Sequence, residues 1–125
     1  MNFIGLRPLA TGEPSNIIQT ENGSDTFDIN ADWLLKNIIL DDQNKAENLR
    51  LAFSPAAESN RTFELYFSRV NELAILPEFG AVDGPYDHIN EFRCWQKNKK
   101  DYIEFFGAMR QLHFTFDTVT LLVNQ

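Results

Sequence analysis

The stretch from Asp87 to Leu112 contains the densest aromatic cluster of the chain and most of its clustered positive charge. Its apolar residues recur at steps of three, four and seven, which is the spacing that gives a helix one apolar face. The rest of the chain must then fold so as to cover that face. If the stretch is helical, the face carries Ile89, Phe92, Trp95, Tyr102, Phe106, Met109 and Leu112.

The polar centre of this stretch, from Gln96 to Asp101, leaves its structure open. It is either the solvent-facing side of one long helix or a break between two helices, with Asp101 as a second cap. In an alternative interpretation, residues 89–95 form a strand and only residues 100–111 are helical.

A second helix is expected over residues 30–40. The side chain of Asn30 or Asp32 can cap its N-terminus. Asp41 and Asp42 are expected to end it, because carboxylates at a helix C-terminus oppose the macrodipole. Its apolar face would consist of Trp33, Leu34, Ile38 and Leu40.

Residues 48–69 alternate apolar and polar side chains, which is the pattern of a β-hairpin with one buried face. A helix from Lys45 to Phe53 is the competing interpretation, since the Ala and Glu content permits it. A third strand is expected at 72–76. The buried face of the hairpin would carry Leu49, Leu51, Phe53, Phe63, Leu65 and Phe67.

Weaker signals complete the pattern. Residues 2–9 form a short opening strand, and the run from Glu21 to Asp25 predicts a turn, because Asn-Gly readily adopts positive φ. Residues 112–123 alternate Leu and Phe with polar residues and then become β-branched, which predicts a C-terminal strand.

These elements predict one α+β domain spanning residues 1–125. Its antiparallel sheet would have three to five strands, including the hairpin 48–69 and the C-terminal strand 112–123, and two or three helices would cover one face of the sheet. A chain of 125 residues with 43% hydrophobic content is long enough to bury one ordinary core.

The charge of the chain bears on its partners. It has 18 acidic and 11 basic residues, giving a formal net charge of −7. Nucleic acid and anionic membrane are not expected as partners, because both attract proteins through Lys and Arg. A single Cys94, the lack of a long apolar run and a poor secretory signal favour a reducing, cytoplasmic setting.

No cofactor or metal site is predicted. Asp28, Asn30 and Asp32 have the alternating oxygen ligands that open an EF-hand calcium loop. Trp33 and Ile39 then stand where that loop needs Gly and a bidentate Glu. The cysteine and histidine spacings match no zinc site, and the glycines match no phosphate-binding loop.

No catalytic residue is predicted either. Cys94 with His88 or His113 is the available thiol–imidazole pair. Cys94 is interpreted as a small buried hydrophobe, and His113 as a residue on the solvent face of a strand. No pair of carboxylates is singled out for acid–base chemistry.

Charge segregation is the feature that points to a function. Residues 8–35 contain five acidic residues, and residues 70–92 contain five more; apart from these, neither segment contains a charged residue. If the two segments share one surface, they form an acidic patch that attracts a cationic partner, with Tyr86 as an aromatic anchor. The expected partner-binding residues are Asp25, Asp28, Asp32, Glu72, Glu78, Asp83, Tyr86, Asp87 and Glu91.

The leading hypothesis is a small acidic inhibitor of a basic protein, most specifically an immunity protein that blocks a cationic toxin such as a nuclease. One alternative is a small-ligand-binding or enzymatic module with a pocket between sheet and helix. Another is a subunit or scaffold of a larger complex, with an exposed apolar patch formed by Phe105 and Phe106.

Overall fold

The computed structural model describes residues 1–41, 47–76, 89–107 and 110–124. Those residues form eleven strands in three sheets. The five-stranded sheet contains, in spatial order, β1 (Asn2–Ile4), β11 (Thr118–Asn124), β6 (Thr62–Ser68), β5 (Asn48–Pro55) and β4 (Trp33–Asp41). The four-stranded sheet contains β7 (Asn71–Leu76), β10 (Gln111–Thr115), β9 (Lys100–Gly107) and β8 (Ile89–Lys97), and a separate ribbon pairs β2 (Ile17–Gln19) with β3 (Thr26–Asp28).

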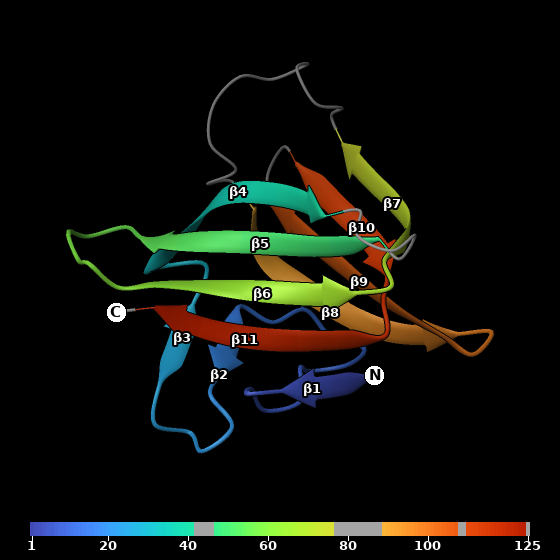
Figure 1. The fold of residues 1–125 in the computed structure, drawn as a ribbon, viewed down its shortest axis with the longest axis horizontal. Helices are drawn as coiled ribbons and strands as arrows, with labels where there is room; N and C mark the ends of the chain where they lie inside the picture. The colour runs from blue at the N-terminus through green and yellow to red at the C-terminus, as the bar shows by residue number, and fades with distance from the viewer. Residues whose placement is uncertain (42–46, 77–88, 108–109, 125) are drawn as a thin grey trace.

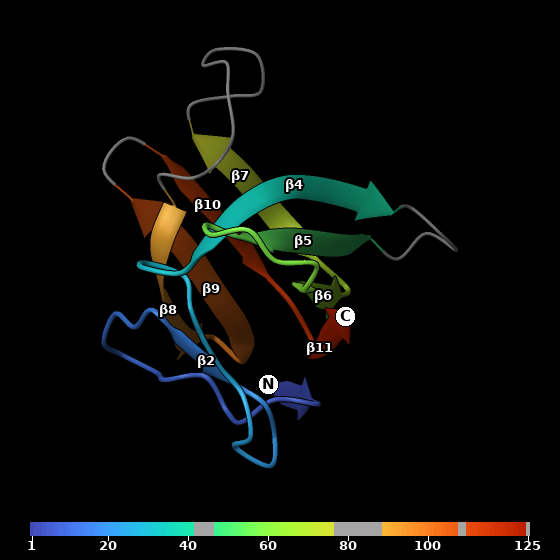
Figure 2. The same ribbon diagram turned by 90° about the vertical axis from the view of Figure 1, so that its left-hand side faces the viewer.

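The two larger sheets face each other as the layers of a β-sandwich (Figures 1 and 2). Phenylalanine rings fill the space between them. Phe53 stacks on Phe63 within the five-stranded sheet, with ring centroids 4.6 Å apart. Phe67 joins the layers, because its ring meets the edges of Phe105 and Phe114 from the four-stranded sheet. Buried aromatic rings of this size supply much of the free energy that holds two sheets together.

The N-terminal segment links the two layers (Figure 2). β1 pairs with β11 in parallel, at the edge of the five-stranded sheet. Further along, Thr11 and Ser15 make isolated bridges to Cys94 and Phe92 on β8, at the edge of the four-stranded sheet. The segment therefore covers an edge of each sheet, which leaves fewer unpaired backbone groups there.

The α+β prediction is wrong, because the described residues are all-β and contain no helix. The stretch expected to be helical at 30–40 contains strand β4, in which Trp33 and Leu35 are buried and a bulge at Lys36 resets the alternation. A bulge hides the period of two, so the apolar residues on either side of it come to resemble a helical face.

The stretch from 89 to 107 is the hairpin β8–β9, so the long helix predicted there is also wrong. The alternative interpretation is correct in expecting a strand at residues 89–95. It is wrong in expecting a helix at residues 100–111, because residues 100–107 form strand β9. Asn98 and Lys99 form the two-residue turn, with φ of 53° and 63°. Positive φ at both positions is the type I′ geometry that fits the twist of a hairpin, although neither residue is glycine.

Several strand predictions are confirmed. The hairpin 48–69 is β5–β6, with Leu49 opposite Phe67 and Phe53 opposite Phe63, all buried. The third strand is β7, and the opening strand is the shorter β1. The expected turn joins β2 to β3, where Gly23 has φ of 74°.

The C-terminal strand predicted at 112–123 is two strands in different sheets. Phe116 donates its backbone N–H to the Asp101 carbonyl in the four-stranded sheet, and Asp117 donates to Ser68 in the five-stranded sheet. The chain therefore crosses between the layers at this point. The crossing is marked by the consecutive polar residues Asp117 and Thr118, which shift the alternation by one residue between Phe116 and Val119.

Candidate binding surface on the four-stranded sheet

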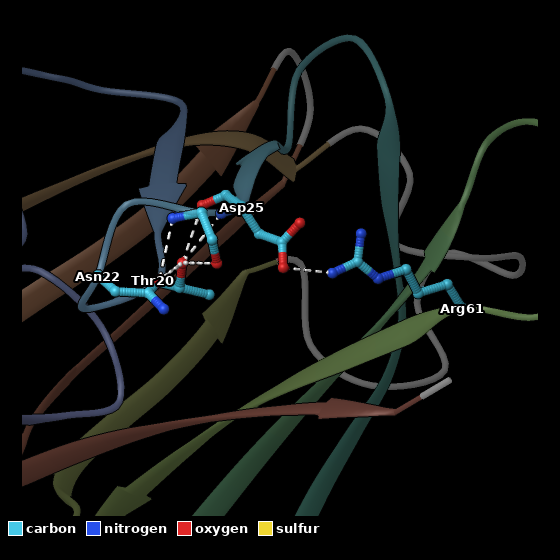
Figure 3. Close-up of polar contacts among 5 residues, drawn as sticks. Thr20, Asn22, Asp25 and Arg61 are labelled. Atoms are coloured by element: carbon cyan, nitrogen blue, oxygen red, sulfur yellow. Dashed lines mark hydrogen bonds and ion pairs between the residues drawn. The ribbon is translucent and has the colours of Figure 1, made fainter.

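Asp25, the first of the expected partner-binding residues, is engaged within the protein. Its carboxylate lies 2.6 Å from the Arg61 guanidinium, an ion pair that ties the β2–β3 turn to the loop before β6 (Figure 3). The Asp25 backbone N–H donates to the Thr20 hydroxyl, which in turn donates to the Asn22 side chain (Figure 3). These contacts give Asp25 a structural role that accounts for its position.

Asp28 is likewise used locally. One carboxylate oxygen accepts hydrogen bonds from the Asn16 side chain at 2.7 Å and from the backbone N–H groups of Asn30 and Ala31. Burial raises the pKa of Asp28, but these three donors outweigh it, so the pKa is lowered. Asp32 follows with an exposed side chain.

The acidic residues of the second segment are divided. Glu72 lies 3.4 Å from the Lys100 ammonium, which offsets its charge. Glu91 lies on β8 and faces away from the core, opposite Phe106 on β9. The other three acids, Glu78, Asp83 and Asp87, lie outside the described residues, as does the expected anchor Tyr86. Asp25 and Asp28 belong to the ribbon, whereas Glu72 and Glu91 belong to the four-stranded sheet.

Cys94 is fully buried between the sheets, as the sequence interpretation expected. Burial, with a smaller contribution from the negative charge of Asp101, raises the pKa of its thiol to about 12. The thiol therefore stays protonated and is a poor nucleophile. His113 faces outward on β10, and His88 lies outside the described residues. The described part of the chain contains no group of three or more His, Cys, Asp or Glu residues that could hold a metal ion.

A hollow of about 510 Å³ lies where the β8–β9 turn, the β6–β7 turn and the β10–β11 crossing meet. It contains two ion pairs: Arg69 lies 3.7 Å from Asp117, and Lys100 pairs with Glu72. Its lining consists of Arg69, Asn71, Glu72, Lys99, Lys100, Asp101, Thr115, Phe116 and Asp117.

Asp101 is the most perturbed carboxyl of this hollow. Burial raises its pKa, but hydrogen bonds from the N-terminal amine of Met1 and from Gln96, together with the positive charge of that amine, lower it overall. A carboxyl with a lowered pKa stays ionised at neutral pH and has no proton to donate. Asp101 is therefore not suited to act as a general acid in this hollow.

The outer face of the four-stranded sheet carries the most distinctive surface chemistry. Strand register arranges its side chains in rows across the sheet, because residues directly opposite each other share a face. Three rows cross β8, β9 and β10: Glu91–Phe106–Gln111, Arg93–Glu104–His113 and Trp95–Tyr102–Thr115. The opposite pair Lys97 and Lys100 continues this face to the β8–β9 turn. Apart from buried Thr115, these side chains are exposed or partly exposed, so aromatic and charged groups are interleaved on one face.

Two of these rows are in direct contact. The rings of Trp95 and Tyr102 are nearly parallel, at 6°, with centroids 5.3 Å apart. The Arg93 guanidinium lies over the Trp95 ring, 5.6 Å from its centroid, and 3.6 Å from the Glu104 carboxylate. The Gln111 side chain donates to the other carboxylate oxygen of Glu104 at 3.4 Å. We call Arg93, Trp95, Tyr102 and Glu104 the Trp95 cluster.

Sequence reasoning selected Trp95, Tyr102 and Phe106 but assigned them to the buried face of a helix. The strand alternative for residues 89–95 already contained the missing signal, because a period of two places Glu91, Arg93 and Trp95 on one face. Extending that alternation through the turn to Tyr102 and Glu104 would have predicted this surface.

Comparison with protein families, curated proteins and solved structures found no match to this chain. None of the described residues belongs to a helix long and apolar enough to cross a bilayer. A functional assignment therefore depends on the chemistry of the surface.

Proposed function

We propose that this chain is a small binding protein that covers a basic surface of a protein partner, and that the outer face of its four-stranded sheet makes the contact. The observation that carries the proposal is the Trp95 cluster. Trp, Tyr and Arg are the residue types most enriched at the energetic centres of protein interfaces, and here all three are in contact on one face.

The net charge of the chain favours a cationic partner. On the proposed face, Glu91 and Glu104 lie beside the aromatic residues together with Arg93, and the opposite pair Lys97 and Lys100 lies nearer the turn, where Glu72 pairs with Lys100. The chain as a whole carries a formal net charge of −7. Such a field accelerates association with a basic protein and is screened by salt.

The most specific form of the proposal is an inhibitor of the immunity-protein type, acting in the cytoplasm on a cationic toxin such as a nuclease. A toxin groove that binds nucleic acid is lined with Lys and Arg, so an acidic protein with exposed aromatic anchors is complementary to it. The inhibitor itself is expected to bind neither nucleic acid nor membrane.

The proposal is tested by capturing partners from the native source with the wild-type chain and with two single variants. Trp95→Ala removes the centre of the proposed face, and Tyr66→Ala removes an aromatic ring from the outer face of the five-stranded sheet. The expected result is a basic protein that Trp95→Ala binds roughly 30-fold more weakly, whereas Tyr66→Ala binds it normally.

Affinity for the captured protein should also fall as salt is raised from low to physiological concentration. Equal binding by the wild type and Trp95→Ala, or a partner with an acidic surface, would show that the proposed face is not the binding surface.

A further inference from the structure

We infer that Trp95, Tyr102 and Glu104 form a receptor for an arginine side chain of the partner, and that Arg93 occupies this receptor in the free protein. The inference rests on the proposed function, because it specifies which group of a basic partner the face binds. It also predicts that Arg93 competes with the partner's arginine for the receptor.

The two aromatic rings provide the floor of the receptor. Trp95 and Tyr102 are directly opposite on β8 and β9, and their nearly parallel rings are stacked on each other, so Tyr102 backs the Trp95 ring. A guanidinium is planar and weakly hydrated, so it stacks on such a surface better than an ammonium does. Arg93 already makes this contact, since its guanidinium carbon lies 5.6 Å from the Trp95 centroid.

Glu104 provides the charged wall. Its side chain is only 14% exposed, and the Gln111 amide fixes one of its oxygens at 3.4 Å. A carboxylate held beside an aromatic platform is the arrangement that binds a guanidinium by charge and by stacking together.

Arg93 holds its place weakly. The shortest distance between its guanidinium and the Glu104 carboxylate is 3.6 Å, and the Arg93 side chain is 48% exposed. A strong Arg–carboxylate hydrogen bond is roughly 2.7–2.9 Å long, and exposed ion pairs contribute little free energy. An incoming arginine that approaches along the normal to the sheet can therefore displace Arg93 and make a shorter bond to Glu104.

The other sheet supplies a matched control. On its outer face, Arg50 lies 5.7 Å from the Tyr66 centroid and 3.7 Å from Glu64. This group repeats the ion pair and the cation–π contact of the Trp95 cluster, but its ring is the single phenol of Tyr66. Removing Arg50 changes the net charge by the same amount as removing Arg93 but uncovers no tryptophan ring.

The test uses a capped hexa-arginine peptide as probe, titrated calorimetrically at low salt into the wild type, Arg93→Gln and Arg50→Gln. Both variants gain affinity from the lost positive charge. Arg93→Gln should gain about fivefold more than Arg50→Gln, because it also frees an occupied site. Trp95→Ala and Glu104→Gln should each weaken binding by at least a similar factor.

Thermal unfolding of each variant verifies that the sheet is intact, and a hexalysine peptide tests the choice of ligand. Hexalysine should gain less than hexa-arginine from Arg93→Gln. Equal gains for Arg93→Gln and Arg50→Gln, or equal gains for the two peptides, would overturn the arginine receptor. Either result leaves the proposed function standing as long as Trp95→Ala still loses the native partner; if Trp95→Ala retains that partner, the proposed function itself fails.

Discussion

Phe105 and Phe106 are adjacent and chemically identical, but replacement by alanine is expected to cost much more stability at Phe105 than at Phe106. Phe105 is 0% exposed and packs against Phe67 and Phe92, whereas Phe106 lies on the outer face of the sheet between Glu91 and Gln111. A buried Phe removes about 150–250 Å² from water, which at about 25 cal/mol per Å² corresponds to roughly 4–6 kcal/mol.

Measured Phe→Ala changes in protein cores cost about 3–5 kcal/mol, so we expect Phe105→Ala to lose that much of the free energy of unfolding. Phe106→Ala should lose about 1 kcal/mol or less, as surface substitutions do. Because a typical domain has only about 5–15 kcal/mol of stability, Phe105→Leu provides a milder variant that remains folded for measurement.

The assay is equilibrium unfolding in urea, followed by circular dichroism and by tryptophan fluorescence. Equal m-values would show that the variants unfold from comparably compact states. A helix over 87–112 would bury Phe106, so it predicts the reverse order. A loss for Phe106→Ala as large as that for Phe105→Ala would refute the strand assignment and the outer face with it.

Three further predictions concern single groups. Because the pKa of Asp28 is lowered from 3.8 in the folded state, its carboxylate stabilises the fold above about pH 3.8, and this contribution disappears as the pH falls through the folded-state pKa. Asp28→Asn should therefore flatten the acid limb of a stability–pH profile, and an unchanged limb would contradict the Asn16 and backbone hydrogen bonds. Cys94, with its pKa of about 12, should react with a thiol reagent only after unfolding, so fast labelling of the native protein would be inconsistent with its burial. Lys99→Gly should stabilise the protein by about 1 kcal/mol in thermal or urea unfolding, because glycine accepts the positive φ that follows Asn98 without strain; a loss of stability would argue against the type I′ turn.

The hairpin β5–β6 could be predicted from the sequence because its alternation is uninterrupted. Leu49, Leu51 and Phe53 all point to the core, and the opposite strand repeats the pattern in phase. Both strands lie inside the five-stranded sheet rather than at its edge, so one face of each is fully covered. Under these conditions local pattern and tertiary environment agree.

The hairpin β8–β9 was not predicted because the apolar residues of this stretch fit both the helical period and the period of two of a strand. Phe92, Trp95 and Tyr102 follow a helical spacing, but Phe92 and Cys94 are buried whereas Trp95 faces outward, as a period of two requires. The turn at Asn98 and Lys99 lacks the glycine that usually marks such a hairpin. Only the pairing of β8 with β9 decides between the two periods.

The candidate surface depended on the same decision. Trp95 and Tyr102 were recognised as an aromatic cluster, but Arg93 and Glu104 join them only when the register is known. The acidic patch was expected because residues 8–35 and 70–92 each contain five acidic residues and no Lys or Arg. That expectation used positions in the sequence and not positions in the fold. The fold uses Asp25 and Asp28 for local contacts and keeps Glu91 on the outer face.

Hydroxyl-radical footprinting of the free protein and of its complex with the captured partner tests the central claim most directly, since it reports the solvent exposure of each aromatic side chain. Binding through the outer face of the four-stranded sheet predicts that Trp95, Tyr102 and Phe106 lose reactivity in the complex while Tyr66 on the opposite face keeps its own. Loss of reactivity at Tyr66 with Trp95 unchanged would contradict the account.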